Sequence, residues 1–345
     1  MSTSAHRPLL TEAELHASGA SIAALQQADG MIPWFAGGHC DPWNHVETAM
    51  ALSITGFTDE AVRAYEWLAR TQRTDGSWHN YYLADGSIED AKLDTNVCAY
   101  IATGVWHHWL ATGDHAIVER FFPVVERALD WVLTLQTPRG EVIWARHVDG
   151  KPWSYALLTG SSSISHALRC GVALATLVEG DGRPDWELAA VNLAEAVRTQ
   201  PNAFEPKHRW AMDWYYPVLC GAITGAAAHE RLASRWDEFV MPGLGVRCVN
   251  NEPWVTAAET AECALAHAVC GLTDSAAELL DWTRAHRTDD GSYWTGIVYP
   301  QQVHFPAGER TAYTAAAIVL AADGLHGGSP TAGIFHGQHL PPLQP

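Results

Sequence analysis

The chain has 345 residues, of which 48% are apolar and 17% charged, so it can build one large core or two ordinary ones and is not a disordered chain. Its net charge of −18 argues against nucleic acid and anionic membrane surfaces as partners. We find no apolar run near the roughly 20 residues of a membrane span, and the start MSTSAHRPLLTEAELH lacks a signal-peptide core. A cytoplasmic protein is therefore expected.

Seven cysteines are scattered along the chain without a CxxC pair, which argues against disulfides and a cysteine zinc site. The one cluster with the character of metal ligands is Cys40 with His39 and His45, and it lacks a second thiol. We expect neither a metal nor a cofactor.

Two kinds of helical segment alternate along the chain. One kind is amphipathic with a charged face, which is typical of outer helices: 11–27, 59–72, 115–137, 184–199, 228–240 and 274–287. The other is rich in Ala, Leu, Cys and Gly, which is typical of buried helices: 42–56, 94–112, 161–179, 217–227, 256–271 and 309–323.

The connections between these segments are unequal in length. Each inner segment reaches the next outer one through a short turn such as LATGDHA, whereas each outer segment reaches the next inner one through a long loop. An open array would need polar caps at its ends, and none is evident. We therefore expect an all-α, closed (α/α)6 toroid, or six-hairpin barrel, as a single domain over 1–326. Residues 327–345 would be a Pro/Gly-rich C-terminal tail.

The segment RAYEWLARTQRTDGSW, from Arg63 to Trp78, resembles the QW repeat of squalene cyclases and related prenyltransferase-fold proteins. RALDWVLTLQTPRGEVIW, from Arg127, is a near match, and LLDWTRAHRTDDGSYW, from Leu279, is weaker because Arg287 replaces the glutamine. The resemblance implies a structural role, with Gln72 and Gln136 satisfying backbone groups at the ends of outer helices, far from the pocket. The DxDD acid cluster of those cyclases and a DDxxD diphosphate site are both missing.

A second resemblance is to glucoamylase-like six-hairpin glycosidases. It rests on HHWLATGDHAIVERFFPVVERALDWVLTLQ, from His107, and on GEVIWARHVDGKPWSYALLTGSSSISHAL, from Gly140. The second stretch is similar to their acid-bearing loop, but Trp144 is followed by Ala145 and Arg146 where those enzymes carry the general-acid Glu. The resemblance therefore implies the fold and the loop without the acid.

Each inner segment begins with a polar cluster, and a toroid gathers these starts at one mouth. The clusters are CDPWNHVE from Cys40, KLDTN from Lys92, GSSSISH from Gly160, AMDWYYP from Ala211, TAAETAE from Thr256 and GERTAY from Gly308. We expect a polar, aromatic-lined substrate site there, built from Asp41, Trp43, His45, Glu47, Asp94, Asn96, Trp153, Trp214, Tyr215, Glu259 and Arg310.

Many of these residues also have a purely structural interpretation. Asp41, Asp94 and Asp213 suit helix N-caps, and a histidine in a wall is more often hydrogen-bonded than catalytic. Glu262 lies a turn inside a buried helix, where an unpaired acid is costly, which favours a functional role. As catalytic candidates we take Glu309 or Glu262 as the base, with His166 or Asp213 as the acid partner.

The density of polar residues favours a small polyhydroxylated substrate. We therefore expect an enzyme that acts on a sugar, glycoside or uronide by carboxylate and histidine acid–base chemistry, with hydrolysis, elimination and epimerisation all open. A terpenoid cyclase or prenyltransferase-like enzyme is the alternative that the QW segments suggest. A non-catalytic binding toroid is the third, and the oligomeric state is left open.

Overall fold

A computed structural model describes residues 9–343 of the chain, so the first eight residues of the expected domain and the last two of the expected tail lie outside it. The outer helices are α1 (Glu12–Ala23), α3 (Thr58–Thr71), α6 (His115–Leu133), α8 (Pro184–Thr199), α10 (Gly225–Ser234) with the short α11 (Trp236–Phe239), and α13 (Thr273–Trp282). The inner helices are α2 (Pro42–Ile54), α4 (Thr95–Ala99) with α5 (Ile101–Thr112), α7 (Leu158–Glu179), α9 (Met212–Leu219), α12 (Ala257–Val269) and α14 (Ala312–His326). The predicted alternation of outer and inner helices is confirmed.

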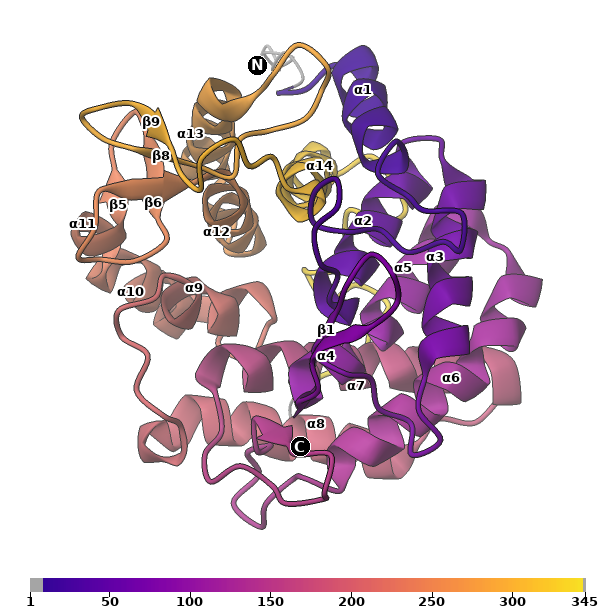
Figure 1. Ribbon diagram of the computed structural model, residues 1–345. Helices are drawn as coiled ribbons and strands as arrows, with labels where there is room; N and C mark the ends of the chain where they lie inside the picture. The colour runs from indigo at the N-terminus through magenta and orange to yellow at the C-terminus, as the bar shows by residue number, and fades with distance from the viewer. Residues whose placement is uncertain (1–8, 344–345) are drawn as a thin grey trace.

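The inner helices contact one another in succession. α2 contacts α5, α5 contacts α7, and α7, α9, α12 and α14 follow in the same way, until α14 contacts α2. Figure 1 shows these helices around the middle of the molecule, with the outer helices outside them. Inner helices are buried on nearly every side, as in α14, where ten side chains from Ala312 to Ala322 are buried. This explains their lack of charge.

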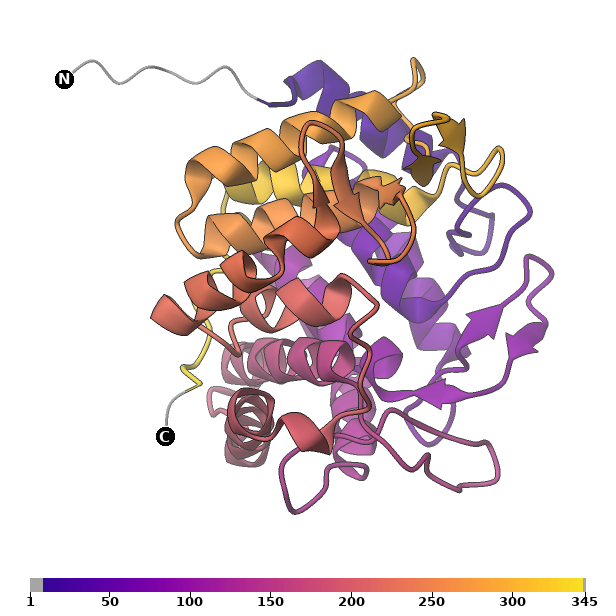
Figure 2. The same ribbon diagram turned by 90° about the vertical axis from the view of Figure 1, so that its left-hand side faces the viewer.

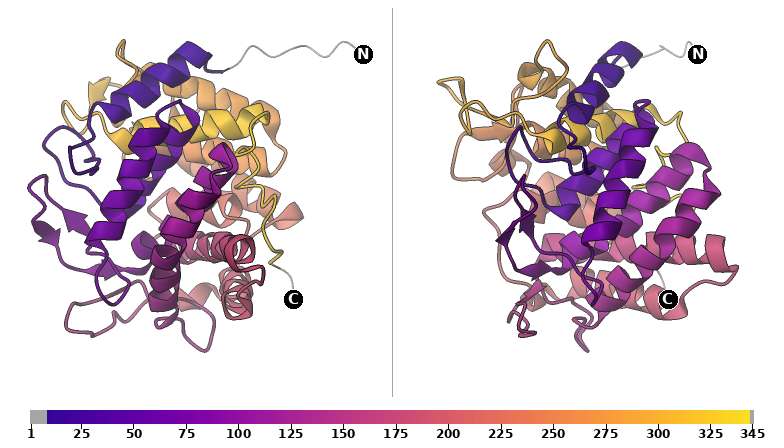
Figure 3. Two further views of the ribbon diagram at one scale, coloured as in Figure 1. Left: turned by 90° about the vertical axis from the view of Figure 1, so that its right-hand side faces the viewer. Right: turned by 45° about the vertical axis from the view of Figure 1, so that its right-hand side comes forward.

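The long loops carry short strands, which the expectation of an almost all-helical chain did not include. Two antiparallel pairs join β1 (Tyr81–Tyr82) with β2 (Ile88–Asp90), and β3 (Leu93–Asp94) with β4 (Ala145–Arg146). A five-stranded sheet joins β5 (Val240–Met241), β6 (Gly245–Arg247), β7 (Trp254–Thr256), β8 (Gly296–Val298) and β9 (Val303–His304) in that order. Figure 2 shows the strands and long loops at one end of the helices, and Figure 3 shows the C-terminal segment at the other.

The QW segments join consecutive outer helices. Gln72, at the end of α3, donates from Nε2 to the carbonyls of Gly76 and of Val124 in α6, both at 2.9 Å. Gln136 repeats this contact with Gly140 and with Ala189 in α8, both at 3.0 Å. Trp78 is fully buried nearby and donates to the carbonyl of Leu68 at 2.9 Å. The predicted structural role of both glutamines is confirmed.

A glycine and an arginine also take part in the contacts between outer helices. Gly76 has a φ of 96°, and a Cβ there would lie 2.2 Å from the carbonyl oxygen of Arg127, so only glycine fits. Arg287, which replaces the glutamine in the last segment, donates to the carbonyl of Glu14 in α1 at 3.1 Å. It thereby links the last outer segment to the first.

No helix within residues 9–343 is long and apolar enough to cross a membrane. All seven cysteines are free thiols.

Candidate active site

A pocket of about 330 Å³, here called the mouth pocket, lies among the starts of the inner helices. It is lined by Trp34, Asp41, Trp43, Asn44, Glu47, Asn80, Tyr81, Lys92, Asp94, Val97, Trp144, Met212, Ala258, Glu259, Glu262 and Tyr313. Five carboxyl groups and five Trp or Tyr rings therefore share one cavity.

Asp41 and Asp94 are the N-caps of α2 and α4, as expected. Asp41 accepts from the Asn44 amide (3.0 Å) and from the indole of Trp34 (2.7 Å), and burial raises its pKa. Asp94 accepts from the backbone amides of Asn96 (3.0 Å) and Val97 (3.3 Å). Burial raises the pKa of Asp94 to about 6, against the opposing influence of Lys92 and of these hydrogen bonds. A carboxyl group with that pKa exists in both protonation states near neutral pH.

Glu47 and Glu262 form the floor of the pocket. Glu262 accepts from the hydroxyls of Tyr215 (2.5 Å) and Tyr216 (2.7 Å), and burial still raises its pKa to about 7. Glu47 accepts from the indole of Trp43 at 3.2 Å, and burial, followed by the charge of Glu262, raises its pKa well above the ordinary range. The two carboxyl groups therefore resist being ionised together.

Glu259 lies one helical turn before Glu262 on α12, closer to the start of the helix. It is partly exposed, and its charge adds to burial in raising the pKa of the Cys248 thiol and of the Tyr313 hydroxyl. α4 and α12 occupy opposite places in the succession of inner helices, so Glu259 and Asp94 belong to opposite walls.

Aromatic rings surround these acids. Trp34 packs edge-on against Tyr313, with ring centroids 5.0 Å apart, and against Tyr81 at 5.8 Å. Trp144 carries the Lys92 ammonium 4.2 Å from its ring centroid. Aromatic faces beside hydrogen-bonding carboxylates and amides are a common arrangement for binding polar ligands with apolar faces.

The structure brings together six of the site residues expected from sequence: Asp41, Trp43, Glu47, Asp94, Glu259 and Glu262. Tyr215 supports the site through its bond to Glu262. Asn96 is buried at the start of α4, and Trp153 packs on Trp144 with centroids 4.6 Å apart. His45 has the structural role, since its ring nitrogens contact the Ile32 amide (3.2 Å) and the Ala64 carbonyl (2.9 Å).

The other candidates lie outside the mouth pocket, so the expected convergence of all of them is wrong. Asp213 and Trp214 line a separate cavity beside α10, and Glu309 and Arg310 line one beside α1. His166 lies below the floor, where its Nε2 contacts the Ile334 carbonyl at 3.1 Å and burial lowers its pKa to about 4. The starts of the inner helices lie close together, but the position of a residue around its helix axis decides which cavity its side chain faces.

Sequence reasoning missed several lining residues: Trp34, Asn44, Asn80, Tyr81, Trp144 and Tyr313. Most lie in the long loops, where no periodicity marks them. Asn44 was within reach, since it follows the predicted cap Asp41 by three residues and donates to its carboxylate at 2.7 Å. Residues 9–343 contain no group of three or more His, Cys, Asp or Glu that could hold a metal ion.

The fold is similar to solved sugar enzymes. A glycosidase in complex with glucose superposes with a TM-score of 0.72 over 91% of this chain and 98% of its own, at 17% identity. The GH63 mannosylglycerate hydrolase of Thermus thermophilus gives 0.64 over 89% and 99%, at 13% identity. A D-mannose isomerase gives 0.67 over 90% and 96%, at 12% identity. Such identities establish the fold alone.

Over 342 residues the chain is 48% identical to the MMP endo-(1,4)-3-O-methyl-α-D-mannosidase of Mycolicibacterium hassiacum, covering 96% of this chain and 92% of the relative. Together with the helical fold and its acidic, aromatic pocket, this relationship defines a glycosidase that acts on sugars. The chain belongs to the family of that endo-mannosidase. No protein-family model matches it. These findings agree with the glycosidase resemblance and lend no support to the cyclase one.

Proposed function

We propose that this protein hydrolyses internal α-(1,4) linkages of oligosaccharides built from 3-O-methyl-D-mannose, and that the reaction takes place in the mouth pocket. The substrate follows from the name of the 48% identical relative. The observation that carries the location is the joint presence of carboxyl groups on opposite walls and aromatic rings around them. Hydrolysis of a glycoside needs one carboxyl group as acid and a second as base or nucleophile.

Asp94 is our candidate for the general acid. Its strand β3 pairs with β4, so that Asp94 lies directly opposite Ala145. Ala145 follows Trp144 in the loop that resembles the acid-bearing loop of six-hairpin glycosidases. Directly paired residues project to the same face of a sheet, so Asp94 offers a carboxyl group where that loop lacks one. Its raised pKa keeps a protonated fraction available to the leaving oxygen.

Glu259 is the proposed partner that activates water or attacks the anomeric carbon. It is on the wall opposite Asp94, near the start of α12, and it is partly exposed. Glu262 and Glu47, which resist joint ionisation, are assigned to holding sugar hydroxyls at the floor. The sequence-based candidates Glu309, Asp213 and His166 have no direct part in this proposal.

The architecture we propose for this enzyme is the closed (α/α)6 toroid in a single catalytic unit over residues 1–326. The contact of α14 with α2 and the link from Arg287 to α1 support closure. The final segment from residue 327 would complete the floor.

Activity on a 3-O-methylated α-(1,4)-mannooligosaccharide tests the proposal. We expect Asp94→Asn and Glu259→Gln to lower kcat by about 10²–10⁴-fold, which is the usual range for losing an acid or base. Glu309→Gln is the matched control and should retain activity, because its carboxylate accepts from Thr295 (3.2 Å) in another cavity. Full activity of Asp94→Asn, or loss in Glu309→Gln with normal folding, would refute the assignment.

A further inference from the structure

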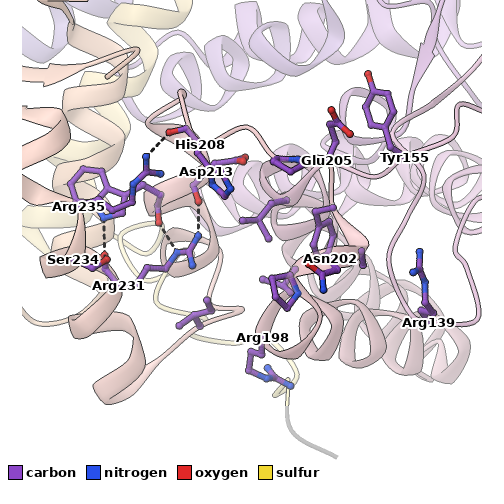
Figure 4. A pocket seen from close by; sticks show the side chains of 18 of the residues that line it. Arg139, Tyr155, Arg198, Asn202, Glu205, His208, Asp213, Arg231, Ser234 and Arg235 are labelled. Carbon is purple, nitrogen blue, oxygen red and sulfur yellow. Dashed lines mark hydrogen bonds between the residues drawn. The ribbon is translucent and has the colours of Figure 1, made fainter. Parts of the chain in front are cut away.

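A second, larger cavity of about 800 Å³, here called the side cavity, lies beside the mouth pocket. Neither of the proposed catalytic residues, Asp94 and Glu259, lines it. Figure 4 shows Arg231 and Ser234 of α10, with Arg235 directly after it, on one side of the cavity, and Asn202, Glu205 and Tyr155 on the other. Asn202 is in the 3₁₀ turn η1 (Pro201–Ala203), and Glu205 follows in the loop to α9.

The two cavities share a wall. Trp144 lines the mouth pocket and Tyr155 lines the side cavity, and their rings stack with centroids 5.4 Å apart at an interplanar angle of 23°. The consecutive residues Met212 and Asp213, at the start of α9, line the mouth pocket and the side cavity respectively. The side cavity therefore adjoins the mouth pocket across Trp144, Tyr155 and the start of α9.

The arginines of the side cavity are largely engaged by the protein itself. Arg198 pairs with Glu195 at 2.8 Å, and Arg235 pairs with Glu238. Arg231 donates to the backbone carbonyls of Trp214 (2.7 Å) and Asp213 (2.6 Å). The cavity therefore calls for no strongly anionic ligand, in spite of its arginines.

The lining of the side cavity has both polar and apolar side chains. Exposed polar side chains at Asn202, Glu205 and His208 stand beside apolar surface from Leu158, Pro206 and buried Phe204. A neutral chain with both hydroxyl and methyl ether groups matches this lining, since hydroxyls need hydrogen-bond partners and methyl groups need apolar contact.

We propose that the side cavity is a distal binding site for several units of the same O-methylated mannan chain whose scissile linkage lies in the mouth pocket. This inference rests on the proposed function. An endo-acting enzyme must hold units beyond the linkage that it cleaves, and the side cavity is more than twice as large as the mouth pocket. Binding energy gained there acts on long chains and not on short ones.

Chain-length dependence provides the test. The double variant Asn202→Ala/Glu205→Ala removes two exposed polar groups, and Ser154→Trp fills the cavity from its loop. We expect kcat/KM on long 3-O-methylmannan chains to fall about tenfold, chiefly through KM, because each lost hydrogen bond is worth roughly two- to tenfold. Activity on a short α-mannoside should stay within about twofold by the same argument. Asn192→Ala, exposed on α8 and outside both linings, is the matched control.

The outcomes separate the two proposals. If the wild-type protein cleaves neither long nor short mannosides, the proposed function fails. If it cleaves both, and the variants change long and short substrates equally or not at all, the distal site is refuted and the proposed function stands. A selective loss on long chains in both variants, with unchanged melting temperatures, supports the distal site.

Discussion

Asp94 is the residue whose ionisation should govern the rate. Burial raises its pKa to about 6, and the proposed mechanism needs its protonated form. We therefore expect kcat/KM on mannooligosaccharides to decrease as the pH rises above about 6, since the acid form is lost. Asp94→Asn should abolish this limb together with most of the activity. Rates measured from pH 4.5 to 8.5 check this, and a limb that persists unchanged in Asp94→Asn would contradict it.

Glu262 is expected to make stability depend on pH. Its pKa in the folded protein is about 7 because of burial, against an ordinary value of 4.5, so the folded state holds the proton more tightly. Between these two pH values the free energy of unfolding must decrease as the pH rises, and this contribution is constant above about 7. We expect a loss on the order of 3 kcal/mol over this interval.

Glu262→Gln should reduce this dependence, because a neutral amide has no proton to lose. Urea unfolding at pH 5 and pH 7.5 measures it, and Glu187→Gln, exposed on α8, serves as the control. If stability increases from pH 5 to pH 7.5 in the wild type but not in Glu262→Gln, the burial argument is wrong.

The contacts of Gln72 and Gln136 with the next outer helix can be tested by mutation. Gln72→Ala removes the hydrogen bond to Val124 that joins α3 to α6 and a second bond to Gly76 in the turn after α3, and we expect the free energy of unfolding to fall by about 1–3 kcal/mol. The rate on a mannoside should be unchanged, because Gln72 does not line the mouth pocket. Gln301→Ala, at an exposed position, is the control. A large loss of kcat with normal stability would contradict the structural role.

The elements show which parts of the fold a sequence can predict. Helices of a dozen residues or more carry enough periodicity to be found, and most bounds are close, as in α8 (Pro184–Thr199). The predicted segment 217–227 instead begins at Met212 and ends at Leu219, with Pro217 inside α9. Strands of two or three residues, such as β5, carry no measurable alternation and so were not predicted.

The candidate site was predicted in part for a similar reason. Cap positions such as Asp41 and Asp94 are local signals, and the packing of the inner helices brings both to one pocket. Whether Glu259 faces that pocket depends on the rotation of α12 about its axis, and whether Glu309 does depends on the path of the loop that leads to α14; only packing decides either. Loop residues such as Trp34 reach the site because the loop folds back over the pocket, and no local sequence pattern predicts that path.

In the molecule as a whole, the C-terminal segment covers the end of the inner helices that lies opposite the mouth pocket. The ring of Phe335 stacks on His166 with centroids 5.3 Å apart, and Arg169 donates to the Pro341 carbonyl at 2.6 Å. Phe335 and His166 also line a small cavity of about 20 Å³ beneath Glu47 and Glu262. The segment thereby covers the carboxyl groups of Glu47 and Glu262 on the side away from the mouth pocket.

Phe335→Ala should admit water below the floor. Solvation would lower the pKa of Glu262 toward its ordinary value, so the pH dependence of stability should weaken as in Glu262→Gln. Some overall stability will also be lost, about 3 kcal/mol for a large buried ring. The exposed Phe305→Ala is the control. An unaltered difference between pH 5 and pH 7.5 in Phe335→Ala would contradict this role of the segment.

The central claim is that the mouth pocket is where the glycoside is cleaved. A crystal structure of Asp94→Asn with a 3-O-methylated α-(1,4)-mannooligosaccharide tests it most directly. We expect a glycosidic oxygen beside residue 94, a sugar ring facing Glu259, and further units over Trp144 and Tyr155. An oligosaccharide bound instead beside Glu309 and Arg310, with the mouth pocket empty, would contradict it.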